Sequence, residues 1–327
     1  MHMNHFEHII GRSAELQQLL NTASIISQTD VTVLIEGDTG TGKELLARAM
    51  HAASSRAAKP FIAVNCAALT GLPEMLTVAQ LFGHKQGVQA DLVGAEIPQA
   101  AADSEQVGFI QQSDGGTLFL DEVGELSLAV QARLLGFIEH GEYQRSTESR
   151  SDVRIVASTS CDLQQQVTNG EFREDLFYRL NVIPLSVPSL IKRAEDIPLL
   201  GQHFMALLAK QHNLPEAKFS KAAINKLKQY EWPGNCRELR NLCESLLLLL
   251  QGRAIDEMNL PAYISSARVS TGSAFKLPAS GIKLDELEVD LLHQALQATA
   301  GNKSRAARML GITRDVFLYR LKKYSIG

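Results

Sequence analysis

A glycine-rich segment between an apolar run and a helical stretch constrains the fold of this chain most strongly. Residues 37–44 read GDTGTGKE, after the apolar run Val31–Ile35 and before ELLARAMHAAS. A glycine-rich turn between a strand and a helix lets backbone N–H groups close on an anion, and the helix N-terminus adds its dipole. An ordinary Gly-rich turn with a solvated lysine is the alternative. The strand–loop–helix context favours a P-loop that binds a nucleoside triphosphate, with Lys43 reaching the outer phosphates.

The predicted cofactor is ATP with Mg²⁺. The general P-loop pattern has Ser or Thr after the lysine, as a magnesium ligand, whereas this chain has Glu44. The residues predicted to bind the nucleotide in this loop are Gly37, Asp38, Thr39, Gly40, Thr41, Gly42, Lys43 and Glu44.

A second apolar run ends in two carboxylates, as the other half of such a site requires. The run Gly116–Leu120 is followed directly by Asp121 and Glu122. Asp121 is predicted to bind the nucleotide's magnesium, and Glu122 to orient the attacking water or accept its proton. The two acids could instead open the next helix, where negative charge favours the dipole. Together with the upstream loop they predict nucleotide hydrolysis.

Charge is segregated along the chain. The 327 residues carry a net charge of −4, but residues 301–327 hold seven Lys and Arg against one Asp, a net of +6. The other 300 residues therefore carry a net of −10. A basic C-terminal segment on an otherwise acidic chain predicts a nucleic-acid-binding domain attached to a module that does not itself bind DNA.

Nothing in the sequence indicates export. The start, MHMNHFEHIIGRS, has neither a basic nor an apolar signal region, and the four cysteines form no CxxC pair. We therefore expect reduced thiols and a cytoplasmic protein.

The order of patterns predicts an α/β fold followed by helical segments. Apolar strands alternate with helical stretches up to about residue 188, which predicts a parallel sheet with helices on both faces. Helical patterns alone follow, and a Ser-, Gly-, Ala- and Pro-rich stretch reads as a linker. The predicted domains are an α/β nucleotide-binding subdomain over 1–188, a helical lid over 189–264, a linker over 265–283, and a DNA-binding domain over 284–327. The predicted strands are Val31–Ile35, Phe61–Val64, Thr117–Leu120, Val153–Ala157 and Val182–Val187.

The C-terminal segment predicts three helices. Leu284, Leu287, Leu291, Ala295 and Ala298 share one face of the first. Two short helices follow, joined by a tight glycine turn, with a threonine N-cap on the second. This arrangement resembles a helix-turn-helix whose second helix enters the major groove of double-stranded DNA; a basic three-helix cap without DNA contact is the alternative. The predicted DNA-binding residues are Lys303, Arg305, Thr313, Arg314, Tyr319, Arg320, Lys322 and Lys323.

Taken together, the motifs resemble the AAA+ bacterial enhancer-binding proteins, transcriptional activators that remodel sigma-54 RNA polymerase. The resemblance spans almost the whole chain, and a glutamate after the P-loop lysine is ordinary in that family. The tail GNKSRAARMLGITRDVFLYRLKKYSI resembles the family's Fis-type three-helix DNA-binding domain. The segments that carry the resemblance are GDTGTGKELLARAMH, PFIAVNCAAL, QLFGHKQG, GGTLFLDEVGEL, VQARLLGFIEHGEYQR, FREDLFYRLNVIP and WPGNCREL.

The resemblance implies roles for four further residues. Asn65 would be a switch residue that hydrogen-bonds Glu122, and Arg237 would touch the nucleotide from the lid. Arg173 and Arg179 would be arginine fingers that reach the γ-phosphate of a neighbouring subunit, which implies a ring, with a hexamer as the expected form. Without the resemblance, surface ion pairing would be the simpler interpretation of each arginine.

Two departures from the family pattern bear on how the protein would engage the sigma factor and hydrolyse ATP. The family carries a GAFTGA loop whose Phe and Thr engage the sigma factor, but the stretch between Gly87 and Gly108 contains no Phe-Thr pair. Ser160 stands where the family usually has an Asn that senses the γ-phosphate. We also expect the activity of the protein to be controlled by a partner, by nucleotide or by a domain outside this chain, because only about eight residues precede the AAA+ module.

Four functions remain open from the sequence. The altered loop favours a regulator that acts without standard sigma-54 engagement, over an ATP-hydrolysing activator of sigma-54 RNA polymerase. A DNA-binding protein with an inactive ATPase is the third. An AAA+ protein-remodelling ATPase whose basic tail docks an adaptor is the fourth.

Overall fold

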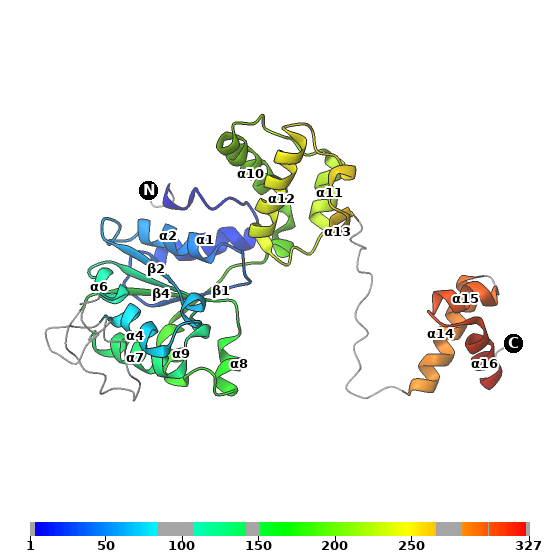
Figure 1. Cartoon of the computed structure of the whole chain (residues 1–327), viewed down its shortest axis with the longest axis horizontal. Helices are drawn as coiled ribbons and strands as arrows, with labels where there is room; N and C mark the ends of the chain where they lie inside the picture. Colours follow the sequence, from blue (N-terminus) through cyan, green and yellow to red (C-terminus); the bar gives the residue numbers. More distant parts are fainter. Residues whose placement is uncertain (1–3, 84–106, 142–150, 266–282, 300, 325–327) are drawn as a thin grey trace. The chain divides into compact units, whose positions relative to one another are not determined.

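A computed structural model describes residues 4–83, 107–141, 151–265, 283–299 and 301–324. The chain divides into two compact units, Met1–Ala267 and Arg268–Gly327, and each is described by itself (Figure 1). Two segments singled out in the sequence fall largely outside the described residues: the stretch between Gly87 and Gly108, and the linker over 265–283. No described helix is long and apolar enough to cross a lipid bilayer.

The first unit is built on a five-stranded parallel sheet, which confirms the predicted α/β class. The strand order is β2-β3-β4-β1-β5, and every pairing is parallel. All carboxyl ends therefore lie at one edge, where ligands bind in open α/β sheets. The strands are β1 (Val33–Glu36), β2 (Phe61–Asn65), β3 (Thr117–Asp121), β4 (Arg154–Thr159) and β5 (Ile183–Ser186).

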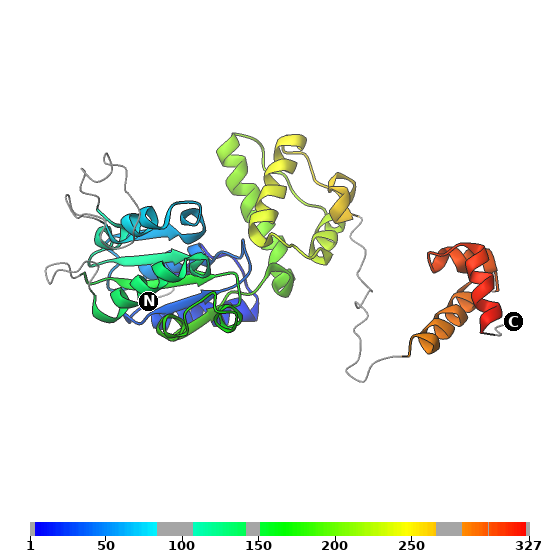
Figure 2. The same cartoon turned by 60° about the horizontal axis from the view of Figure 1, so that its bottom comes forward.

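Helices cover both faces of this sheet (Figures 1 and 2). The short helices beside them are η1 (Asn4–Phe6) and η2 (Val123–Glu125). The α-helices are α1 (Ala14–Ile26), α2 (Lys43–Ala52), α3 (Cys66–Leu69), α4 (Glu74–Phe82), α6 (Phe109–Gln112), α7 (Leu128–His140), α8 (Leu163–Thr168) and α9 (Glu174–Leu180).

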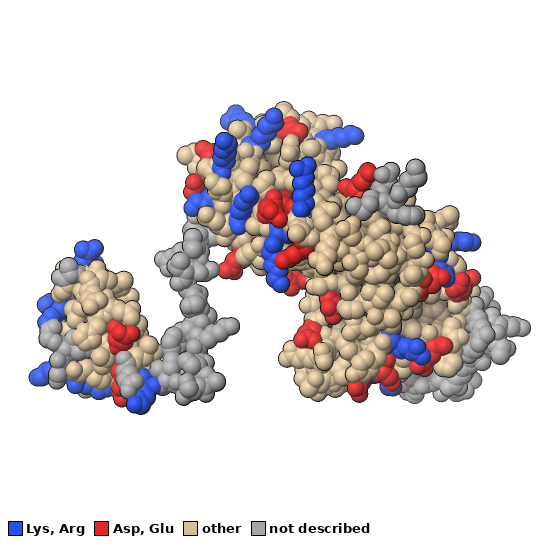
Figure 3. Space-filling model, turned by 180° about the vertical axis from the view of Figure 1, so that it is seen from behind, with Lys and Arg blue, Asp and Glu red and all other residues tan. Residues whose placement is uncertain are grey.

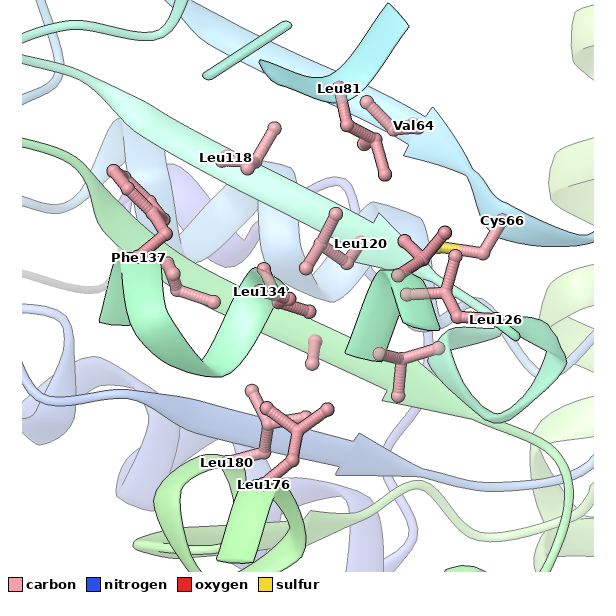
Figure 4. Close-up of a cluster of buried hydrophobic side chains, with 14 of the residues drawn as sticks. Val64, Cys66, Leu81, Leu118, Leu120, Leu126, Leu134, Phe137, Leu176 and Leu180 are labelled. Carbon is pink, nitrogen blue, oxygen red and sulfur yellow. The ribbon is translucent and has the colours of Figure 1, made fainter. Parts of the chain in front are cut away.

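Strand residues alternate between two apolar cores because successive side chains point to opposite faces. Leu118 and Leu120 belong to a core shared with α4, α7 and α9, whereas Phe119 packs into a core shared with α1 and α2. Figure 4 shows the first core, with Leu134 and Leu176 facing the sheet from their helices. β3 is therefore buried on both sides, and it carries Asp121 at its end.

The lid follows β5 and has its own core. Trp232 is 1% exposed at the centre of this core, and its indole N–H donates to the carbonyl oxygen of Leu227 at 2.8 Å. Trp232 and Asn235 both adopt positive φ, so the chain bends sharply over residues 232–235. The lid elements are η3 (Leu190–Asp196), α10 (Ile197–His212), α11 (Lys221–Gln229), α12 (Asn235–Leu250), η4 (Glu257–Asn259) and α13 (Ala262–Ser265).

The second unit contains three helices, α14 (Leu284–Ala298), α15 (Lys303–Met309) and α16 (Arg314–Lys323). Its core contains Leu292, Ala295, Ala306, Phe317 and Leu321, among others. The predicted apolar face of α14 is only partly correct. Leu291 is 43% exposed, because α15 and α16 pack against the neighbouring face centred on Leu292 and Ala295. Thr313 caps α16 as predicted, with its hydroxyl accepting from the N–H of Val316 at 3.4 Å.

Candidate nucleotide-binding site and DNA-binding domain

The loop over residues 37–42 connects β1 to α2 with the geometry of a phosphate cradle. Gly40 and Gly42 adopt φ of 81° and 105°, a region that side chains rarely occupy. A Cβ on Gly40 would also lie 2.3 Å from the carbonyl oxygen of Gly234 in the lid, so no other residue fits there. Asp38 and Thr41 close the turn, since the Thr41 hydroxyl donates to the Asp38 carbonyl at 2.8 Å.

Lys43, the first residue of α2, is buried with only 6% of its side chain exposed. Its Nζ donates to the Gly37 carbonyl at 2.7 Å and forms an ion pair with Glu122 at 3.0 Å. The ammonium group thus lies between the loop and the carboxyl end of β3. Such a position suits a group that binds phosphate oxygens opposite a carboxylate.

Glu122 is held in an uncommon backbone conformation, φ 56° and ψ 53°. Its second carboxylate oxygen accepts hydrogen bonds from the Ser160 N–H at 2.8 Å and from the Ser160 hydroxyl at 2.7 Å. Burial alone would raise the pKa of Glu122, but the hydrogen bonds from Ser160 and Lys43 outweigh burial and keep the pKa below its ordinary value. The carboxylate is therefore ionised near neutral pH, as a proton acceptor must be.

Asp121 lies next to Glu122 and accepts a hydrogen bond from the Ser158 hydroxyl on β4. The described residues contain no group of three or more His, Cys, Asp or Glu that could hold a metal ion by themselves. A single carboxylate still fits Mg²⁺, which keeps several waters and is usually completed by substrate phosphates. Asp121 is the residue that would hold it, beside the loop that would hold the phosphates.

Asn65 ends β2 directly across from Asp121 in the sheet register. Its side chain caps α3 by accepting from the Ala68 N–H at 3.2 Å, while Glu122 is bonded to Lys43 and Ser160. The predicted hydrogen bond from Asn65 to Glu122 is thus not present in this structure. Asn65 and Glu122 nevertheless lie at the carboxyl ends of neighbouring strands, so the role of Asn65 stays a prediction.

Two further predicted nucleotide-binding residues lie at the rim of the loop. Glu44 points its carboxylate to Arg48 one helical turn away, at 2.7 Å, and is about half exposed. Arg237, in the first turn of α12, is exposed, and its Cβ would lie 3.1 Å from a Cβ on Gly40. Arg237 therefore stands beside the cradle, whereas the Glu44 side chain is directed to solvent.

The two predicted finger arginines lie on the surface around α9. Arg173 forms a two-point ion pair with Asp175, with its closest contact at 2.7 Å, and Arg179 is 3.5 Å from Glu139. Arg173 and Arg179 are 42% and 57% exposed. Neither arginine contacts Glu122 or Lys43 within its own chain, so neither completes the site in cis.

An apolar cavity of about 260 Å³ adjoins the loop, and no local sequence pattern predicts it. It lies where the N-terminal segment, α1, α2 and the lid meet, and Thr41 and Gly42 form one end of it. Its position fits a flat apolar base attached to phosphates in the loop. The lining includes Ile10, Leu46, Val187, Leu200, Phe204 and Cys236.

The second unit presents a basic helix-turn-helix. Figure 3 shows Lys and Arg side chains spread over the face of this unit that is in view. Two of the predicted DNA-binding side chains are engaged within the unit: Arg320 forms an ion pair with Glu288 at 2.5 Å, and Lys323 donates to the Tyr324 hydroxyl at 2.7 Å. The remaining predicted residues are exposed: Lys303, Arg305, Thr313, Arg314, Tyr319 and Lys322.

Three family models match this chain in the order of its domains. The sigma-54 interaction domain matches residues 9–186, the AAA+ ATPase lid domain matches residues 192–276, and the Fis family of bacterial regulatory proteins matches residues 283–324.

Individual relatives match over nearly the whole chain. The transcriptional regulatory protein ZraR of Escherichia coli K12 is 42% identical over 318 residues, covering 96% of this chain and 68% of the relative. The DNA-binding transcriptional regulator NtrC of a Bradyrhizobium strain is 39% identical, covering 97% of this chain and 70% of the relative. A crystal structure of NtrX from Brucella abortus in complex with ATP matches with a TM-score of 0.67 at 33% identity, covering 96% of this chain and 68% of that one.

These matches identify the motifs described above as parts of one protein type, a transcriptional regulator with an AAA+ module and a Fis-type helix-turn-helix. The chain belongs to the family of sigma-54-dependent enhancer-binding regulators.

Proposed function

We propose that this chain binds and hydrolyses ATP with Mg²⁺ in the cytoplasm, binds DNA through α15 and α16, and uses hydrolysis to act on sigma-54 RNA polymerase. One observation carries the proposal: the glycine loop, Lys43 and Glu122 meet beside a base-sized cavity at the carboxyl edge of the sheet. A similar protein, NtrX from Brucella abortus, has been crystallised in complex with ATP, which supports nucleotide binding by this chain.

Each residue has a defined task in this proposal. Bound ATP supplies a phosphoryl group that water can attack. When ATP binds, Lys43 moves from Glu122 to the phosphates. The Glu122 oxygen to which Lys43 was bonded is then free to accept a proton from water. Ser160 keeps hold of the other carboxylate oxygen and so fixes its direction. Asp121 would hold the magnesium ion, and Asn65 responds to the nucleotide state from the end of β2.

Catalysis requires more than one subunit in this proposal. Arg173 or Arg179 supplies a positive charge to the site of a neighbouring copy, since each is exposed and remote from its own site. A heterologous contact of this kind closes into a ring if the rotation allows it. We propose a hexameric ring.

The sigma-54 step is the part that needs a direct test. The comparisons give no support to the expectation that the chain acts without sigma-54, since the sigma-54 interaction domain matches residues 9–186. The absence of a Phe-Thr pair between Gly87 and Gly108 nevertheless favours that second candidate, and most of this stretch lies outside the described residues. An AAA+ protein-remodelling ATPase is not favoured, because the Fis family match assigns the tail to DNA-binding regulators.

In vitro transcription from a template with a mapped binding site separates the two candidates. We expect open complexes with polymerase carrying sigma-54, dependent on hydrolysable ATP. If only polymerase carrying the housekeeping sigma factor responds, the second candidate is correct and the sigma-54 proposal is wrong.

The ion pairs of the second unit predict unequal roles for two basic residues of α16. Lys322 is exposed, so Lys322→Ala should remove a phosphate contact and reduce the slope of log K against log salt by about 1. Arg320 is paired with Glu288, so Arg320→Ala should lower the Tm of this unit and leave the salt slope nearly unchanged. Fluorescence anisotropy across a salt series, with thermal unfolding alongside, measures both. Equal slopes for the two variants would contradict this assignment.

A further inference from the structure

Three consecutive carbonyl groups of the phosphate loop accept hydrogen bonds from the lid. The Asn235 amide Nδ2 donates to the Thr39 carbonyl at 3.1 Å, and the backbone N–H of Cys236 donates to the Gly40 carbonyl at 3.0 Å. Nη2 of Arg193 donates to the Thr41 carbonyl at 3.1 Å. The donors come from η3 and the first turn of α12, elements about 150 to 200 residues further along the chain.

These bonds matter because a loop that turns its N–H groups toward an anion turns its carbonyls away from it. Carbonyls that packing shields from water need hydrogen-bond partners, because an unpaired one carries a desolvation cost. The neighbouring carbonyls find theirs locally: Gly37 accepts from Lys43, and Asp38 accepts from Thr41. For the carbonyls of residues 39–41, by contrast, the hydrogen-bond donors described here belong to the lid.

Asn235 is built firmly into this contact. It is 2% exposed, and its φ of 50° is a conformation that persists in a non-glycine residue only where the surroundings hold it. Its Oδ1 accepts from the N–H of Leu190 at 2.7 Å, so one amide bridges the start of the lid and the phosphate loop. The close approach of Gly234 to Gly40 brings the two backbones together at the same point.

Arg193 holds the other end of the contact. It is 3% exposed, and its backbone departs from the helix around it, with φ −119° and ψ 42°. Its Nη2 also lies 3.1 Å from the sulfur of Cys236. The guanidinium is thus committed to the junction between the loop and the lid, away from the surface where most arginines are found.

We propose that Asn235 and Arg193 are positioning residues of the nucleotide site. By holding the carbonyls of Thr39 and Thr41 they orient the loop N–H groups toward the phosphates, so that the lid and the phosphate cradle form together. The role is separate from the one predicted for Arg237, whose side chain would touch nucleotide directly. The inference rests on the proposed binding of ATP.

The test is Asn235→Asp in the full chain. Aspartate tolerates positive φ and keeps an acceptor for Leu190, but an ionised carboxylate cannot donate to Thr39 and repels its carbonyl. We expect the affinity for ATP and ADP to fall about tenfold, as for the loss of a part-buried hydrogen bond and the new repulsion between the carboxylate and the Thr39 carbonyl. The affinity for adenosine should be unchanged, because adenosine places no phosphate in the loop. Isothermal titration calorimetry measures all three ligands.

The controls separate this role from a general loss of structure. Asn225→Asp makes the same change at an exposed position on α11 of the lid and should leave all three affinities unchanged. If Asn235→Asp fails to fold, Asn235→Gly removes the donor with no strain at positive φ, and the same loss confined to phosphate-bearing ligands is expected.

The outcomes are distinct. Unchanged ATP affinity in the variant, or a parallel loss for adenosine, overturns the positioning role while leaving nucleotide binding intact in the native chain. If the native chain itself binds no ATP, the proposed function fails, and the positioning role fails with it.

Discussion

Replacing Glu122 by Gln should strongly reduce ATP hydrolysis while leaving nucleotide binding nearly intact. The amide keeps the size of the side chain and still accepts a hydrogen bond, but it cannot take a proton from water. General base catalysis contributes about 10²- to 10⁴-fold, so phosphate release at saturating ATP should fall by that factor. Affinity should be equal or slightly higher, because Lys43 no longer has to leave an ionised carboxylate to reach the phosphates.

A control three residues away makes the result specific. Glu125 follows in η2 and is exposed, so Glu125→Gln removes the same charge from the same turn without touching Lys43 or Ser160. Its rate should match that of the native chain. Equal rates for the native chain and Glu122→Gln would show that this site does not hydrolyse ATP and that the chain is a DNA-binding protein with an inactive ATPase.

Replacing Arg173 by Ala should reduce hydrolysis by a comparable or larger factor, yet the defect should be rescued in a mixture. An arginine that reaches the γ-phosphate from a neighbouring subunit is worth about 10³- to 10⁵-fold in rate. The Arg173 guanidinium is exposed and, among the residues that the structure describes, is paired with Asp175 alone, so it loses little by leaving that partner. The variant should still bind ATP, because its own loop, Lys43 and Glu122 are intact.

The rescue experiment mixes Arg173→Ala with Glu122→Gln. In a mixed ring, about a quarter of the interfaces join an intact Glu122 to an intact Arg173, so activity should return although each variant alone is inactive. Arg253→Ala, at an exposed position in the lid, controls for the loss of a surface arginine and should hydrolyse ATP normally. If the mixture stays inactive while Arg179→Ala can be rescued instead, the finger is Arg179.

Local sequence patterns predicted most elements because their causes are local. Apolar runs bounded by turn residues identified all five strands, with boundaries displaced by one or two residues: β1 spans Val33–Glu36 where Val31–Ile35 was predicted. The glycine loop and the two acids could be predicted because a phosphate cradle needs a fixed order of residue types in a short stretch. The cap at Thr313 follows from the same kind of rule.

Contacts between distant residues could not be predicted this way. Nothing near Asn235 or Arg193 in the sequence reveals that each donates to the phosphate loop, because the pairing depends on how the lid packs. The apolar face of α14 was misplaced for a related reason: Leu291 and Leu292 are equally apolar, and only the packing of α15 and α16 decides which is covered. The pairing of Arg320 with Glu288 likewise depends on two helices meeting.

Because β3 is buried on both faces of the sheet, it restricts which parts of the nucleotide-binding subdomain can move. Thr117 to Leu120 are fully inaccessible to solvent, and β2 and β4 flank the strand on both edges. A strand enclosed in this way opens only when the whole subdomain unfolds. Asp121 and Glu122, at its end, are therefore attached to a strand that resists local opening. If the proposed hydrolysis drives a conformational change, that change must occur in the elements around β3, while β3 itself stays in place.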